Sequence, residues 1–155
     1  MPILESNIFI TGNLEDLSCT QKDISEWVQA LIDVEEGLDE LITAKNINFS
    51  FVSEEEIQKL NLTFLKKDKP TNVLSFPSPA TDLNQDLLGD IAICIDAIKK
   101  ESHEQGKETA DHLIHIILHS VLHLVGYDHE DEASANKMEL LEISTLKKIG
   151  IANPY

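Results

Sequence analysis

The stretch His119-Ser-Val-Leu-His-Leu-Val-Gly-Tyr-Asp-His129 carries three histidines at spacings of four and six residues. Residues four apart project from one face of an α-helix, so His119 and His123 can reach one metal ion. Gly126 accepts the left-handed conformation that ends many helices, and the returning chain can bring His129 to the same ion. Three protein ligands with one open position are typical of catalytic zinc. The stretch therefore predicts a catalytic metal site, although imidazole also binds nickel, copper and iron.

Ser120 follows the first histidine, at the position where a zinc peptidase carries the glutamate that activates water. Because serine offers no carboxylate, peptide cleavage is not expected from this site, and the general base is left unassigned. Five other polar residues are candidates to lie near the metal, either as partners of its ligands or, for the acidic ones after the third histidine, as a solvated loop. They are Asp128, Glu130, Asp131, Asp90 and Ser75.

Three further histidines lie upstream of the metal motif. His115 shares a helix face with His119 and His123, so it is the nearer candidate for contact with the ligands or with substrate. His112 is expected to pack on the helix surface. His103 lies in a polar stretch and is expected to be exposed to solvent.

The charge of the chain is strongly negative. Its 155 residues carry 28 acidic and 12 basic side chains, all of the latter lysine, for a net charge of −16. This balance argues against a polyanion as partner. However, salt screens charges beyond roughly 10 Å, so a local basic patch can still act. One dense cluster, Lys66, Lys67 and Lys69, is either a solvated loop or a basic patch that binds a polyanion such as a nucleic acid.

Length and composition predict one soluble domain over residues 1–155. No stretch approaches the roughly 18 consecutive apolar residues of a membrane helix, and the first residues do not resemble a signal peptide, so a cytoplasmic protein is expected. Cys19 and Cys94 are far apart and lack metal-ligand spacing. They are expected to be free thiols in a reducing compartment.

Hydrophobic patterns predict an α/β (α+β) fold, in which about five helices pack a small mixed sheet of about four strands. The expected strands cover residues 7–11, 47–52, 71–76 and 87–94. The expected helices begin at the capping boxes Thr20–Asp23 and Ser53–Glu56, at the candidate cap Asp96, near Glu108 and after Asp131. Residues 41–44 fit a strand or a helix end, and residues 78–85 fit a loop. The metal-bearing helix over 108–125 has a wide apolar stripe and is expected to be central.

Two further segments give this pattern a family resemblance. Leu60-Asn61 is followed by Lys67-Asp-Lys-Pro-Thr-Asn-Val-Leu-Ser-Phe-Pro77, and Leu88-Gly-Asp-Ile91 lies between that run and the histidines. In the order and spacing of these motifs the chain resembles the YbeY family of bacterial endoribonucleases, which are rRNA maturation factors. The resemblance spans most of the chain, from about residue 47 to residue 155.

The resemblance implies a mixed α/β sheet with the metal helix at its centre. It also implies one zinc ion per chain, bound by His119, His123 and His129. The implied activity is that of a single-strand-specific, zinc-dependent endoribonuclease that acts in small-subunit rRNA processing, ribosome maturation and quality control. The implied partners are single-stranded rRNA and the ribosome or its small subunit, and a ribosomal protein is a further candidate.

The chain departs from the family at Phe64-Leu65, where its relatives commonly carry Tyr-Arg. Leucine cannot replace a guanidinium that binds phosphate through a planar fork. Either Lys66 or Lys67 supplies the charge, or the activity is weak. Two alternatives therefore stay open: a non-catalytic, zinc-stabilised ribosome-assembly factor, and a metal hydrolase of another substrate.

Overall fold

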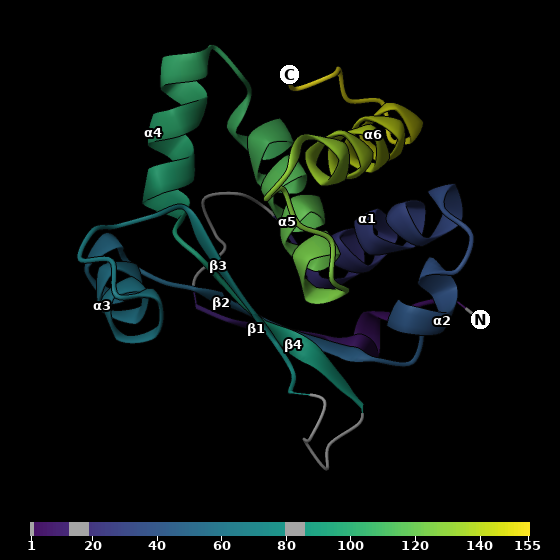
Figure 1. The fold of residues 1–155 in the computed structure, drawn as a ribbon, viewed down its shortest axis with the longest axis horizontal. Coiled ribbons are helices and arrows are strands. Elements are labelled where there is room, and N and C mark those ends of the chain that lie inside the picture. Colours follow the sequence, from purple (N-terminus) through teal and green to yellow (C-terminus); the bar gives the residue numbers. More distant parts are fainter. Residues whose placement is uncertain (1, 13–18, 80–85) are drawn as a thin grey trace.

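The computed structural model describes residues 2–12, 19–79 and 86–155, which form a four-stranded sheet and seven helices (Figure 1). The strands are β1 (Ile8–Thr11), β2 (Asn46–Phe51), β3 (Val73–Pro77) and β4 (Leu87–Ile93). The helices are the 3-10 helix η1 (Glu5–Asn7) and the α-helices α1 (Gln21–Val34), α2 (Leu38–Ile42), α3 (Glu54–Leu65), α4 (Ile95–Gln105), α5 (Thr109–Leu124) and α6 (Glu132–Lys148). All four expected strands and the mixed α/β fold class are confirmed.

The sheet has the strand order β1-β2-β4-β3. β1 and β4 both run parallel to β2, whereas β3 runs antiparallel to β4. Parallel neighbours need long crossover connections, and here α1 and α2 provide one between β1 and β2. Within the described residues β3 is an edge strand, so one side of its backbone is free of a neighbouring strand.

The two faces of the sheet pack against different helices. Side chains that alternate along β2 and β4, such as Phe49 and Ile91, belong to the main core together with α1, α5 and α6. On the other face, Leu74 and Ala92 pack with Ile57 of α3 in a smaller cluster. Figure 1 accordingly shows α1, α5 and α6 together on one side of the sheet and α3 on the other.

The metal-bearing helix α5 is central, as expected. It packs against β3, β4, α1, α4 and α6, and most of its residues are buried. Gly89 of β4 permits this close packing, because a Cβ there would lie 2.6 Å from Leu124 Cδ2 and 2.6 Å from the Phe76 carbonyl oxygen. Among the described residues, no helix is both long and apolar enough to cross a membrane.

Some local predictions are corrected. The described residues form six α-helices, against about five expected, because α2 has five residues and is too short for a periodic signal. The undecided stretch 41–44 contains a helix end, since Ile42 is the last residue of α2 and Thr43 is its C-cap. Asp96 does not cap α4; the helix begins at Ile95 after Cys94, and Asp96 lies in its first turn. The Ser53 hydroxyl accepts from the Glu56 amide, but the return bond of a capping box is absent. Most of the expected loop at 78–85 lies outside the described residues.

The two cysteines are buried free thiols, as predicted. Burial raises the pKa of Cys19 to about 11, with a further contribution from the charge of Asp23. Burial is also the largest influence that raises the pKa of Cys94. A high pKa keeps a thiol protonated and unreactive, so neither cysteine resembles a nucleophile or a metal ligand.

The capping box of α1 gives a stability prediction. Thr20 Oγ1 accepts from the Asp23 amide at 3.1 Å, and Asp23 Oδ2 accepts from the Thr20 amide at 2.9 Å. We expect Thr20→Ala to lower the free energy of unfolding by about 1 kcal/mol, because two amides at the helix start lose their ordered pairing. Urea denaturation measures the change, with the exposed Lys22→Ala as control. Equal stability of the two variants would contradict the prediction.

Candidate metal centre

Three histidines converge where α5 ends. His119 and His123 lie one turn apart on α5, which ends at Leu124. Gly126 adopts a φ of 101°, and the chain turns back to bring in His129. One nitrogen from each imidazole lies within 4.8 Å of the others, and the Nε2 atoms of His119 and His123 are 3.0 Å apart. The structure thus brings the predicted ligands together, and the group can hold a metal ion.

The donor set and its geometry fit zinc. Zn–N bonds of about 2.0–2.1 Å in a tetrahedron place ligand atoms about 3.3–3.4 Å apart. The Nε2 atoms of His119 and His123 are 3.0 Å apart, and all three ligand atoms lie within 4.8 Å of one another. The rings of His119 and His129 are stacked, with centroids 5.6 Å apart, and His123 lies edge-on to both. Burial lowers the pKa of His123, and the neighbouring His119 and His129 lower it further. A lowered pKa favours the neutral imidazole, which is the form that binds a metal.

A buried carboxylate, that of Glu142, forms a hydrogen bond with the metal-site residue His119, and it was not predicted from the sequence. Glu142 of α6 has no exposed surface. Its Oε1 accepts from His115 Nε2 at 2.7 Å and from His119 Nδ1 at 3.1 Å, and the Tyr155 hydroxyl donates to both of its oxygens. Burial alone raises the pKa of Glu142, but hydrogen bonds and charge from His115 and His119 outweigh it and hold the pKa at about 2. Glu142 is therefore ionised inside the core.

The other histidines differ in role. His115 contacts a partner of the metal ligand, which agrees with the expectation that it lies near the site. His112 packs on the surface of α5 as expected, where it is buried and pairs with Glu101 at 2.7 Å. The reason is that α4 packs against α5 and carries Glu101 to this position. His103 is exposed, as predicted.

The three histidines open into a cleft of about 600 Å³ between the end of α3 and β3. Its lining comprises Phe64, Leu65, Asn72, Val73, Leu74, Ser75, Phe76, Pro77, His119, His123 and His129. Among the described residues no carboxylate lines this cleft. Although the chain has 28 acidic residues, none of those that the structure describes belongs to the lining of the cleft at the three histidines.

The polar residues that were candidates to lie near the metal occupy different surroundings in the structure. Ser75 lines the cleft and its hydroxyl donates to the Ser120 carbonyl at 3.4 Å. Ser120 itself is buried and does not line the cleft, and its hydroxyl donates to the Ile116 carbonyl of its own helix at 2.6 Å. Asp90 was expected near the cleft but instead accepts from Asn48 on the sheet, because alternation turns its side chain away from α5.

Two acidic residues near the third ligand, Asp128 and Asp131, accept hydrogen bonds from nearby backbone amides. Asp128 Oδ1 accepts from the Glu130 amide at 3.3 Å. Asp131 caps α6, since its Oδ1 accepts from the Ser134 amide at 2.8 Å. Hydrogen bonds from Ser134 lower the pKa of Asp131. These contacts fix the segment that carries His129 and start the helix that carries Glu142.

The lysine cluster lies beside the cleft. Lys66, Lys67 and Lys69 are exposed in the loop between α3 and β3 and are not part of the lining. The loop is fixed by Asn61, whose Nδ2 donates to the Lys69 carbonyl at 2.9 Å. Leu65, directly before the cluster, does line the cleft, so any contact of these lysines with RNA stays a prediction.

Comparison with known proteins agrees with the resemblance. The family model described as Endoribonuclease YbeY matches residues 9–150. A Vesicomyosocius okutanii protein named Endoribonuclease YbeY is 44% identical over the full length of both chains. A protein of the same name from Colwellia psychrerythraea is 42% identical and covers 90% of this chain and 93% of its own. The solution structure of TM1509 from Thermotoga maritima matches with a TM-score of 0.58 and 26% identity, over 92% of this chain and 91% of that chain. The chain therefore belongs to the YbeY family.

Proposed function

We propose that this protein is a single-strand-specific, zinc-dependent endoribonuclease that acts in the cytoplasm on the rRNA of the small ribosomal subunit, in its processing and quality control. Family membership supports the reaction, because the relatives are named endoribonucleases. The observation that carries the proposal is the three-histidine group at the head of a cleft whose described lining holds no carboxylate. Because this lining has no carboxylate, it does not repel the negative charge of an RNA phosphate at close range.

The chain's own residues prepare the site for phosphodiester hydrolysis. His119, His123 and His129 would hold the zinc, which when bound would supply a water with its pKa lowered toward 7 and would polarise a phosphate oxygen. His119 and His123 hold their donor atoms on a buried helix, which fixes the geometry before substrate arrives. The absence of a glutamate base beside the first ligand separates this site from zinc peptidases and weakens the alternative of a peptide hydrolase.

The preference for single strands rests on two aromatic rings in the cleft. Phe64 and Phe76 lie with ring centroids 5.1 Å apart, and Phe64 is 60% exposed. Unpaired bases stack on such rings, whereas bases inside a duplex cannot reach them. The backbone of a strand stacked on Phe64 would pass the exposed lysine cluster Lys66, Lys67 and Lys69.

The acidic surface supports a protein partner on the ribosome. With a net charge of −16 and a cleft free of carboxylates among the described residues, most acidic groups face solvent elsewhere. Complementary charge speeds association and selects partners, so a basic ribosomal protein is the partner class that fits.

The test measures metal content and cleavage on the same preparation. We expect about one zinc per chain by elemental analysis, in accord with the single three-histidine group. Cleavage of a single-stranded rRNA fragment should stop on chelation and return with zinc, while a duplex of the same sequence stays intact. Cleavage that survives chelation would refute zinc dependence. One zinc per chain with no cleavage, even with ribosomal subunits added, would instead favour the assembly-factor alternative.

A further inference from the structure

We propose that Glu142 is a positioning residue for the metal ligand His119, and that His115 and Tyr155 hold Glu142 in place. The inference rests on the proposed metal binding by His119, but not on the nature of the substrate. It concerns the chain's own hydrogen bonds, which extend from the His119 ring on α5 through Glu142 on α6 to Tyr155 after α6.

The first step is the orientation of the His119 ring. Its Nδ1 lies 3.1 Å from Glu142 Oε1, and the same oxygen lies 2.7 Å from His115 Nε2 and 3.1 Å from the Tyr155 hydroxyl. This geometry makes Oε1 the acceptor and His119 Nδ1 a donor. Nε2 is then left with its lone pair, and it points toward His123 Nε2 at 3.0 Å. A carboxylate that binds the far nitrogen of a metal-ligating histidine fixes its tautomer and ring angle and increases its basicity as a ligand.

The second step concerns the free-energy cost of burying the Glu142 carboxylate beside His119. A fully buried carboxylate is unfavourable unless several donors compensate it. Besides His119, the donors are His115 Nε2 at 2.7 Å and the Tyr155 hydroxyl at 3.1 and 3.2 Å. Because three donors converge on one carboxylate, its oxygens are held in one place relative to α5.

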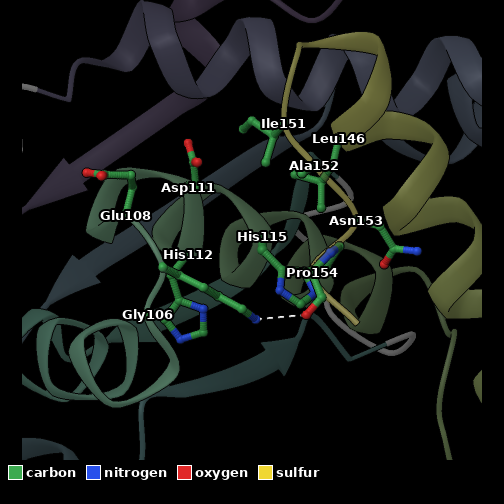
Figure 2. A pocket seen from close by; sticks show the side chains of 11 residues that line it. Gly106, Glu108, Asp111, His112, His115, Leu146, Ile151, Ala152, Asn153 and Pro154 are labelled. Atoms are coloured by element: carbon green, nitrogen blue, oxygen red, sulfur yellow. Dashed lines mark hydrogen bonds between the residues drawn. The ribbon is translucent and has the colours of Figure 1, made fainter.

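The third step is the anchoring of Tyr155. The segment before it crosses α5 beside a pocket of about 270 Å³, which His112 and His115 help to line (Figure 2). There Lys107 Nζ donates to the Pro154 carbonyl at 2.9 Å, the dashed contact of Figure 2. This contact fixes the backbone directly before Tyr155 and so brings the hydroxyl within reach of Glu142. None of the three metal-site histidines lines this pocket, so it lies behind the metal centre and outside the substrate cleft.

The test is the zinc affinity of Glu142→Gln, measured by competition with a chelator. We expect binding about 10- to 100-fold weaker than in the unmodified protein, because the neutral amide oxygen can only form weaker, uncharged hydrogen bonds with the two imidazoles and so orients His119 less firmly. Glu101→Gln is a matched control. Glu101 forms a bond of the same 2.7 Å length to His112 on the same helix, yet touches none of the metal-site histidines. The control should keep its zinc affinity, and equal affinity of Glu142→Gln and the unmodified protein would overturn the proposal.

A second measurement needs no variant and decides the matter if Glu142→Gln does not fold. Nitrogen NMR of the metal-free protein should find His119 protonated at Nδ1 and not at Nε2, whereas the opposite tautomer would overturn the proposal. Both readouts are independent of RNA. If zinc affinity falls as expected but the unmodified protein cleaves no RNA, the proposed nuclease function fails while the role of Glu142 stands.

Discussion

The double variant His119→Ala, His123→Ala is expected to retain no stoichiometric zinc and to cleave single-stranded rRNA at least about 1000-fold more slowly. The change removes two of the three imidazoles that converge within 4.8 Å, and one remaining imidazole cannot hold the ion. Metal activation of water and phosphate supplies several kcal/mol of transition-state stabilisation, and each 1.4 kcal/mol is worth tenfold in rate. Elemental analysis and single-turnover cleavage on one sample measure both effects.

His103→Ala is the control for this variant, because His103 is exposed on α4 and does not line the cleft. It removes an imidazole without touching the metal centre, so zinc content and cleavage should stay unchanged. Circular dichroism checks that the double variant keeps its helices, since both alanines suit a helix interior. A folded, zinc-free double variant that cleaves at the original rate would contradict the metal-dependent mechanism.

The parts of the site that were predictable from sequence are those whose signal is local. His119 and His123 are four residues apart on a strongly apolar helix, and Gly126 marks where that helix must end. Those features alone place His129 near the other two, and the geometry agrees. The strands were predictable for the same reason, because the alternation of apolar and polar side chains, as at residues 46–51, involves only neighbouring residues in the sequence.

Glu142 and Tyr155 were not predictable in the same way, because their partners lie on another element. His115 and Glu142 are 27 residues apart, and their contact exists only because α6 packs on α5. A weak signal was nevertheless present. Met138, Leu141 and Thr145 are buried at helical spacing, and Glu142 occupies a position of the same stripe, where a carboxylate needs a buried partner.

The net charge is a poor guide to RNA binding for a related reason. A sum over the chain, −16, says nothing of where the charges lie. Among the described residues, the cleft is lined by apolar, hydroxyl, amide and imidazole groups, and carboxylates that flank the motif in sequence, such as Asp131, are engaged elsewhere. The cleft is thus compatible with RNA, but at Leu65 it lacks the arginine that the family resemblance leads us to expect.

Leu65→Arg is therefore expected to strengthen the binding of single-stranded RNA by about 10- to 100-fold. Leu65 is the last residue of α3, is 51% exposed and lines the cleft with the three histidines. An arginine there can form a charge-assisted bond with a phosphate, which contributes about 1.5–3 kcal/mol. One added phosphate contact should also steepen the slope of log affinity against log salt by about 0.7 for a single strand. Titrations of labelled RNA at several salt concentrations measure both quantities.

Leu62→Arg provides the matched control, since it adds the same charge to the same helix. Leu62 is 45% exposed, close to the value for Leu65, but it does not line the cleft. If the gain comes from a phosphate held in front of the metal centre, only Leu65→Arg should also accelerate cleavage, because only that contact positions the scissile bond. Equal gains in affinity and rate from both variants would mean that the added charge acts at long range. That result would contradict the prediction that the RNA backbone runs through the cleft.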